Sequence, residues 1–142
     1  MIHIKLGNLS GSSTDKNFSG WSSIYTYAYT TNRPRTSKPG TSDFILGDVS
    51  FSDLYVRKKI DALPSLQSMF DVGRTLIIAD SEANVKITFS DARVVKRHRE
   101  NDYEEIHFSF SKIEEEFTPK DSKNNSKASV KCGYDLVTMK CL

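Results

Sequence analysis

The sequence predicts a mainly β protein: an antiparallel β-barrel or two packed sheets, with one short α-helix docked outside. Apolar and polar residues alternate over many short runs, which is typical of half-buried strands. Helical spacing is clear in one stretch alone, and no helical crossover separates the strands. A chain of 142 residues has room for a modest core, so we expect a single domain over residues 1–142.

The composition indicates an ordinary soluble surface. Twenty basic residues oppose eighteen acidic ones, giving a net charge of +2, which does not favour nucleic acid as a partner. No apolar run reaches membrane-spanning length, so we expect no membrane insertion. The first residues lack the apolar segment of a signal peptide, and two cysteines, Cys132 and Cys141, make no disulfide framework. We therefore expect synthesis in the cytoplasm, with both thiols free there.

The N-terminal third is predicted to hold two strands and a long loop. Residues 2–6 alternate between apolar and polar, and turn-forming residues follow over 7–16. Residues 21–30 are predicted to form a second strand whose odd-numbered face is almost wholly aromatic, so we expect it to pack on the core or on another chain. Residues 31–47 form a polar loop that is long for a compact domain, and such loops are usually functional or disordered.

The helix is expected over residues 61–73, after a strand at 49–55. Asp61 is a suitable N-cap, Pro64 falls in the first turn, where its missing N–H costs nothing, and Gly73 ends the helix. About three turns are too few to be stable alone in water, so this helix must pack an apolar stripe on the sheet. The stripe consists of Leu63, Leu66, Met69 and Phe70.

Two later strands change their buried face midway. A strand at 75–80 precedes one that starts at Val85 and breaks phase near Asp91-Ala92, which indicates a bulge or bend. The strand at 106–117 buries even positions first and odd positions afterwards. Such a change is what a barrel, or a corner between packed sheets, requires.

The remaining segments are polar or charged. A basic run at 93–99 is followed by acids at 100–105, and this near balance favours a charged hairpin over a nucleic-acid contact. Residues 119–131 are predicted to form a polar loop rich in lysine, serine and asparagine. A short strand at 133–139 is expected to close the fold.

No catalytic or metal site is evident in the sequence. It holds neither a Gly-rich phosphate loop nor a nucleophile elbow. His3, His98 and His107 are too scattered to ligate a metal, and we expect them to be exposed or hydrogen-bonded. The glutamates at 114–116 suggest acid–base catalysis, but consecutive strand residues point to opposite faces, which favours a solvated or intersubunit charge stripe. We therefore expect a non-enzymatic protein without cofactor or metal.

Several short motifs follow one another along the chain: Ile4 to Asn8, Gly11 to Lys16, Tyr27-Ala28-Tyr29, Val49 to Leu54 with Ile60-Asp61 and Pro64 to Leu66, Phe108 to Glu114 with Phe117 and Pro119, and Gly133 to Leu136. Their order resembles the haemolysin-coregulated protein (Hcp) family, the tube subunits of type VI secretion. Each motif is weak alone, but they follow one another in the family's order over nearly the whole chain. Tyrosines stand where the family usually has tryptophans, and the long loop is rich in Arg and Pro where the family's is rich in Gly.

This resemblance implies a structural subunit of the secretion system's inner tube. Such a subunit forms a homohexameric ring, and the rings stack into a tube that a contractile sheath propels out of the cell with its spike. The lumen carries or stabilises effector proteins, and the subunit is secreted without a signal peptide.

An alternative is a monomeric β-barrel binding module or secreted inhibitor, which predicts a deep apolar cavity inside the barrel. An enzyme using Glu114 and Glu116 is a third class, and it would need a facing partner that the sequence does not name.

We expect the loop at 31–47 to protrude and make the ring-to-ring contact. Its length is not needed to join two strands, and three cations against one acid give it a local positive charge. The contact residues are predicted to be Arg33, Arg35, Lys38 and Asp43. The candidate acidic partners on the next ring are Asp102, Glu104, Glu105, Glu114 and Glu116, and the sequence does not choose among them.

Overall fold

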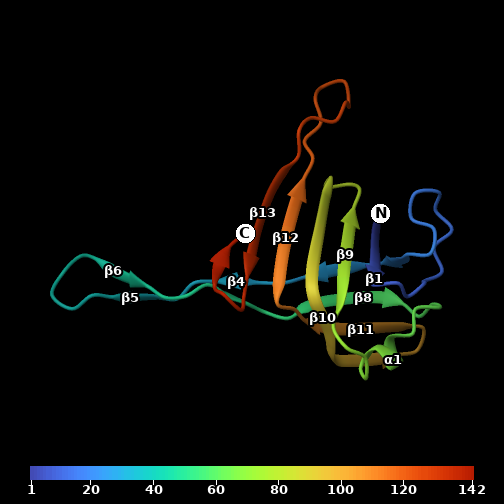
Figure 1. Cartoon of the computed structure of the whole chain (residues 1–142), viewed down its shortest axis with the longest axis horizontal. Helices are drawn as coiled ribbons and strands as arrows, with labels where there is room; N and C mark the ends of the chain where they lie inside the picture. Colours follow the sequence, from blue (N-terminus) through green and yellow to red (C-terminus); the bar gives the residue numbers. More distant parts are fainter.

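The computed structural model describes residues 1–142 and is mainly β, as predicted (Figure 1). Ten strands form one continuous antiparallel sheet that bends into two layers. The large layer has the order β2-β1-β9-β10-β12-β13-β14, and the small layer has the order β10-β11-β8-β3. The strands are β1 (Ile2–Leu6), β2 (Ser22–Ile24), β3 (Thr26–Ala28), β8 (Leu54–Lys59), β9 (Arg74–Asp80), β10 (Val85–Glu100), β11 (Tyr103–Ser109), β12 (Lys112–Phe117), β13 (Val130–Asp135) and β14 (Lys140–Cys141).

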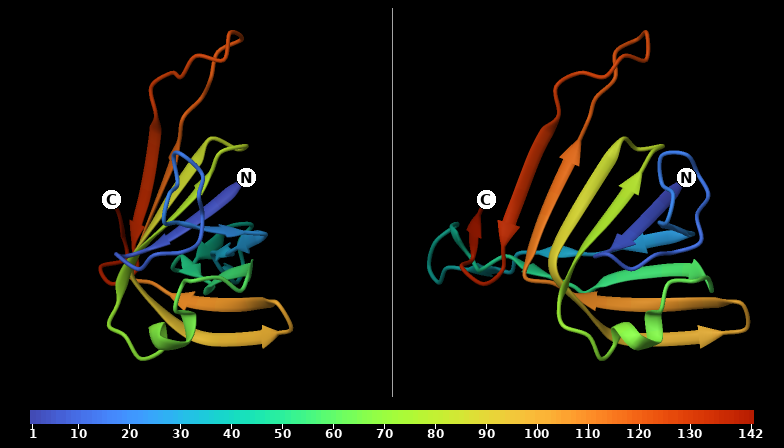
Figure 2. Two further views of the ribbon diagram at one scale, coloured as in Figure 1. Left: turned by 90° about the vertical axis from the view of Figure 1, so that its right-hand side faces the viewer. Right: turned by 45° about the vertical axis from the view of Figure 1, so that its right-hand side comes forward.

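Strand β10 belongs to both layers because it bends where the sequence changes phase. Its first half pairs with β9 and β12, and its second half pairs with β11. The register with β9 shifts between Phe89 and Ala92, and Asp91 there has a φ of 53°. Figure 2 shows β10 curving from the fan of the large layer into the small layer beneath it. The bulge predicted near Asp91-Ala92 is therefore confirmed.

The second predicted phase break is a crossing in the opposite direction. Strand β11 ends at Ser109 in the small layer, and β12 begins at Lys112 in the large one. Phe110 and Ile113 are both buried on either side of this corner. The even and odd halves of the predicted 106–117 strand thus face the same core from two different layers.

The core lies in the angle between the two layers. Its centre is aromatic, with the rings of Phe89 and Phe110 4.9 Å apart. Burying each large apolar side chain stabilises the fold by about 1.5–3 kcal/mol. The core consists of Ile4, Leu6, Ile24, Leu54, Val56, Leu63, Leu76, Ile78, Ile87, Phe89, Ala92, Val94, Ile106, Phe108, Phe110 and Ile113.

The aromatic segment at 21–30 is two strands, not one. Strand β2 pairs with β1 in the large layer, and β3 pairs with β8 in the small layer. Because the chain changes layer at Tyr25, alternation does not continue through it. Tyr25 is left 57% exposed, whereas Tyr27 and Tyr29 pack against the core.

The predicted three-turn helix is a single turn. Helix α1 spans Ser65–Ser68, and its N-cap, Pro64, makes no side-chain capping bond. The buried members of the helix are Ser65 and Ser68. Of the predicted stripe only Leu63 is buried, while Leu66, Met69 and Phe70 face solvent. Gly73 does not end the helix but lies tightly against Asp91, where a Cβ would come within 3.1 Å of the Asp91 Cα.

The 31–47 loop protrudes as predicted, but it has regular structure of its own. It forms a β-hairpin of β5 (Arg35–Ser37) and β6 (Phe44–Leu46), preceded by β4 (Thr31–Asn32) and followed by β7 (Ser50–Phe51). Strand β4 pairs with β7 at its base. Figure 1 shows this hairpin, which we call the arm (residues 31–47), extending away from the body.

The C-terminal strand has other bounds than predicted. The polar segment before β13 protrudes as a second loop, with one isolated bridge between Lys120 and Ser126 (Figure 2). Strand β13 begins at Val130, earlier than expected, and residues 136–139 form a turn instead of continuing the strand. The chain then folds back as β14, so the predicted single strand is a hairpin.

Candidate assembly surfaces

The arm exposes apolar side chains that the body does not cover. Strands β5 and β6 pair through Arg35 with Leu46 and Ser37 with Phe44, and every residue in both strands is exposed. Phe44, Ile45 and Leu46 are consecutive, so they project from both faces of the hairpin. A two-stranded hairpin alone is marginally stable in water, and neither face of the arm contacts a second layer. The apolar side chains of the arm therefore remain accessible to another surface.

The four predicted contact residues lie together on this arm. Arg33 donates from Nε to the Gly47 carbonyl oxygen at 3.1 Å, and the Arg35 guanidinium lies 4.8 Å from the Phe44 ring centroid. Lys38 and Asp43 meet through their backbone, with the Lys38 N–H donating to the Asp43 carbonyl at 3.1 Å. None of the four side chains forms an ion pair within the chain. Their charges remain available to a partner.

Glu104 is not available as an acidic partner, which corrects the prediction. Its side chain is 1% exposed, and both carboxylate oxygens are occupied. Lys58 Nζ lies 3.1 Å from Oε1, while Arg97 Nε and the Ser65 hydroxyl lie 3.0 and 2.6 Å from Oε2. Glu104 points inward from β11 toward the equally buried Lys58 of β8. Each buried charge compensates the other, so this cluster holds the subunit together.

The same cluster explains how α1 is docked without an apolar stripe. Lys58 Nζ also donates to Asp61 Oδ1 at 2.9 Å, and the Leu63 N–H donates to the same oxygen at 2.9 Å. Burial raises the pKa of Asp61, but the hydrogen bonds from Lys58 and from the Leu63 N–H outweigh it and hold that pKa below its ordinary value. The burial of Lys58 could have been predicted from the sequence, because alternation places Lys58 on the same face of β8 as the buried Leu54 and Val56.

The other candidate acids are accessible but differ in their surroundings. Asp102 and Glu105 form no ion pair within the chain. Glu114 and Glu116 share one face of β12 and approach Lys131 Nζ at 3.9 and 3.7 Å. The alternation expected for residues 114–116 is confirmed.

Glu115 points the other way and accepts a hydrogen bond from the Tyr29 hydroxyl. Burial and this bond raise the pKa of Tyr29 above its ordinary value. Glu115 thereby joins β12 to the segment that follows β3.

His3 contradicts the expectation of exposed or hydrogen-bonded histidines. Its ring is buried against Phe18, with centroids 4.3 Å apart, and neither ring nitrogen has a hydrogen-bond partner. Burial lowers the pKa of His3, an effect that Asp15 opposes and the N-terminal ammonium reinforces. His98 lies exposed, 3.5 Å from Glu100, and His107 packs on Tyr55.

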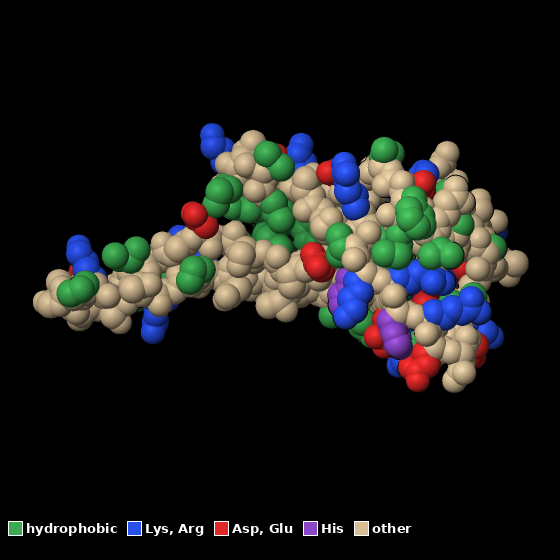
Figure 3. Space-filling model, turned by 90° about the horizontal axis from the view of Figure 1, so that it is seen from below, with side chains coloured by type: hydrophobic (Ala, Val, Ile, Leu, Met, Phe, Trp, Pro, Cys, Tyr) green, Lys and Arg blue, Asp and Glu red, His purple; other side chains and the backbone are tan.

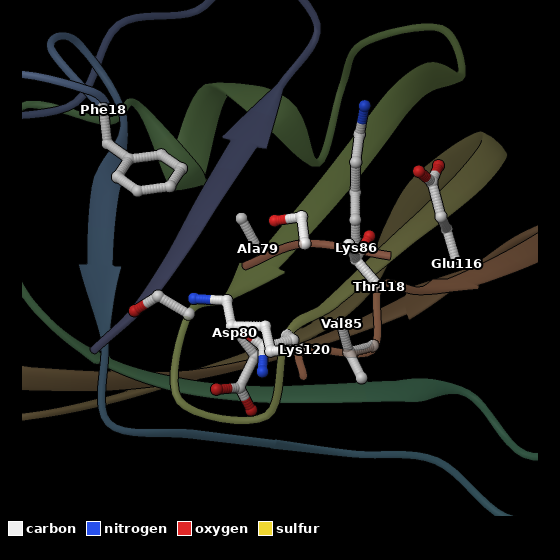
Figure 4. Close-up of a pocket in the computed structure, with 11 residues that line it drawn as sticks. Phe18, Ala79, Asp80, Val85, Lys86, Glu116, Thr118 and Lys120 are labelled. Carbon is white, nitrogen blue, oxygen red and sulfur yellow. The ribbon is translucent and has the colours of Figure 1, made fainter. Parts of the chain in front are cut away.

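The hollows on the surface do not gather a reactive set of side chains. Figure 4 shows one of about 290 Å³, with Phe18 on one side and Lys86 and Glu116 rising from neighbouring strands. The space between the layers is filled by core residues, so the deep apolar cavity of the binding-module alternative is not what the structure shows. No group of three or more candidate metal ligands is present. No helix has the length and apolarity needed to cross a membrane.

A family model described as "Type VI secretion system effector, Hcp" matches residues 3–117. The chain belongs to the Hcp family. Proteins of this family are structural, non-enzymatic components of type VI secretion and are secreted by it, so the resemblance in the sequence is confirmed. A search of curated proteins found no match.

Three solved structures share the fold over nearly their whole length. The structure described as a type six secretion system protein is 21% identical, has a TM-score of 0.88, and the alignment covers 99% of this chain and 98% of that one. Hcp1 from Salmonella typhimurium is 17% identical, with a TM-score of 0.74 over 99% and 97% of the two chains. A type VI secretion system effector from Yersinia pestis is 19% identical, with a TM-score of 0.72 over 95% and 99%. At these identities the likeness establishes the fold.

Proposed function

We propose that this Hcp protein forms closed hexameric rings that stack into the inner tube of the secretion system. The arm is the observation that carries the proposal. Its exposed apolar residues are not covered by the body, and its cations form no ion pair within the subunit. Family membership supplies the context in which a second copy would cover them.

The apolar surfaces are placed for contacts between the end of one copy and the opposite end of the next. Leu66, Met69, Phe70 and Val72 form a second exposed apolar group beside α1. The arm and α1 lie at opposite ends of the molecule in Figure 1, and Figure 3 shows hydrophobic side chains both on the arm and on the far part of the body. Contacts between two different surfaces generate rings or stacks instead of closed dimers. We therefore assign the arm to the ring-to-ring contact.

The charges at the two ends of the molecule are also complementary. The arm carries Arg33, Arg35 and Lys38, while Asp102 and Glu105 lie on or beside the turn of the β10–β11 hairpin, in the same part of the body as α1 (Figure 1). Glu114 and Glu116 are weaker candidates because Lys131 already lies near them. An exposed ion pair contributes on the order of 0–1 kcal/mol. Repetition around a ring makes the sum sensitive to salt.

The tube would be assembled in the cytoplasm and exported by the secretion system. Sheath and spike proteins of the secretion system are its partners in this proposal, and effector proteins occupy the lumen. The packed interior of the subunit supports the lumen as the place for cargo, because cargo would then bind between chains instead of inside one.

Charge reversal on the arm tests the assignment. The variant Arg33→Glu/Arg35→Glu/Lys38→Glu should keep single rings, seen by light scattering and negative-stain imaging, and lose stacks. Lys120→Glu/Lys123→Glu/Lys127→Glu makes the same charge change on the other protruding loop and serves as the matched control. Loss of the ring itself would move the arm to the interface within a ring. Monomers alone at micromolar concentration in the unmodified protein would favour the binding-module alternative.

A further inference from the structure

The two cysteines lie on adjacent strands at the edge of the large layer. Cys141 of β14 pairs with Tyr134 of β13, and Cys132 lies two residues before Tyr134, hence on the same face. Both cysteines are exposed and free. They also line one hollow of about 190 Å³, with Tyr134 and Phe51 in its wall. The structure thus brings together two thiols that the sequence places nine positions apart.

We propose that Cys132 and Cys141 form an intrachain disulfide bond once the protein leaves the reducing cytoplasm. The bond fastens β14, the last strand of the sheet, to β13. The proposal uses the secreted character of the family but does not depend on ring assembly.

The turn between the cysteines is already formed in the reduced protein. Asp135 Oδ1 accepts the backbone N–H groups of Val137 at 2.9 Å and Thr138 at 3.2 Å, and Met139 adopts a φ of 59°. The Leu142 N–H donates to the Gly133 carbonyl at 2.9 Å beyond it. The chain therefore folds back tightly enough to bring both thiols to one face.

Only a small movement is needed to close the bond. Diagonal residues on antiparallel strands have Cα atoms about 7–8 Å apart, and disulfides need about 4.4–6.8 Å. Strand β14 has two residues, pairs with one neighbour and ends one residue before Leu142. A shift of roughly 1–3 Å along this edge displaces no buried side chain, because Cys141 and Leu142 are exposed.

The reaction is thiol–disulfide exchange with a small-molecule disulfide such as oxidised glutathione. One cysteine thiolate attacks the glutathione disulfide and releases one glutathione as its thiol, leaving a mixed disulfide. The second thiolate attacks the protein sulfur of that mixed disulfide and releases the second glutathione. The two protein thiols are oxidised, one disulfide is reduced to two thiols, and the two protons pass to the released thiols.

Mass spectrometry of the whole chain in glutathione buffers tests the proposal. Oxidation should remove both alkylatable thiols and lower the mass by two hydrogens, with no glutathione adduct and no dimer under denaturing, non-reducing conditions. Cys132→Ser and Cys141→Ser should each keep a single thiol that becomes a mixed disulfide. Stable glutathione adducts on both cysteines of the unmodified chain, or a disulfide-linked dimer, would overturn the assignment.

A thermal measurement shows whether the bond fits the folded protein. Closing a loop of ten residues (132–141) restricts the unfolded chain, so oxidation should raise Tm by about 4 °C or more. The same treatment should leave the Tm of the Cys132→Ser/Cys141→Ser variant unchanged. A lower Tm after oxidation would mean that the bond distorts the native hairpin, and the proposal would fail. Light scattering on the same samples reports ring formation separately.

Discussion

Two charged hairpins in this protein differ in whether the body covers them. The β10–β11 hairpin continues into the body, where β11 also pairs with β8, and its central acid, Glu104, is buried against Lys58 and Arg97. Strands β5 and β6 of the arm pair only with each other, and all residues of these two strands are exposed. Glu104 of the first hairpin is therefore paired within the subunit, whereas the charged side chains of the arm form no ion pair within the chain.

The difference follows from what lies opposite each inward-facing position. On β11, Glu104 faces a second strand that supplies a cation at the same depth, so the charges satisfy each other. No layer of the body lies opposite the arm, so the apolar residues on both its faces stay exposed. The charged side chains of a hairpin become part of the interior when a second strand faces them, and they stay accessible when none does.

The largest effect is expected from removing Glu104. Glu104→Ala leaves Lys58 and Arg97 without their shared partner in a buried site, so the free energy of unfolding should fall by about 3–5 kcal/mol. Urea denaturation measures this change. Glu105→Ala, the neighbouring residue on the opposite face, should cost less than about 1 kcal/mol. Equal losses in the two variants would show that the buried cluster has no special role in stability.

A smaller, pH-dependent effect is expected at His3. Its pKa lies below the ordinary value in the folded protein, mainly because of burial, so the unfolded chain binds a proton that the folded chain does not. Stability should therefore decline as the pH falls below about 6.5 toward the folded pKa, and it should gain nothing from His3 at higher pH.

Urea midpoints between pH 5 and 8 measure this dependence. His3→Phe should flatten the profile in that range, while His98→Gln, which alters an exposed histidine, should retain it. A profile unchanged by His3→Phe would assign the pH dependence to other groups.

Little effect on folding is expected from the apolar residues of the arm. Phe44→Ser/Ile45→Ser/Leu46→Ser should change the free energy of unfolding of the dissociated subunit by about 0.5 kcal/mol or less, because these side chains have no neighbours in the body. The association constant for stacking should nevertheless fall at least about tenfold, because a few buried apolar residues contribute most of the binding energy of an interface. Sedimentation velocity at several concentrations measures it. A strongly destabilised monomer would mean that the arm packs on its own subunit.

The smallest effect is expected from salt. Raising ionic strength from about 0.05 to 0.5 M should shorten stacks without changing the urea midpoint of the subunit, because exposed charges are screened and buried ones are not. Imaging at the two salt concentrations tests this expectation. Longer stacks at high salt would indicate that apolar contacts outweigh the arm's charges.

The sequence by itself determined the β class, the bends and the protruding arm. Alternation is a local property, so the strands at residues 2–6 and 75–80 and the phase changes near Asp91 and Phe110 could be predicted from their neighbours alone. The four arm residues of the candidate site were also predicted in this way, because the excess of cations in a long polar loop can be read directly from the sequence.

The tertiary structure decided which of these residues are covered. Apolar spacing at 61–73 predicted a helix, yet a Ser65–Glu104 hydrogen bond docks a single turn and leaves Phe70 exposed. The burial of Glu104 and His3 depends on strands that are distant in sequence, as does the meeting of Cys132 and Cys141 on adjacent strands. Periodicity shows which residues share a face, but only the packing of the layers shows what lies against that face.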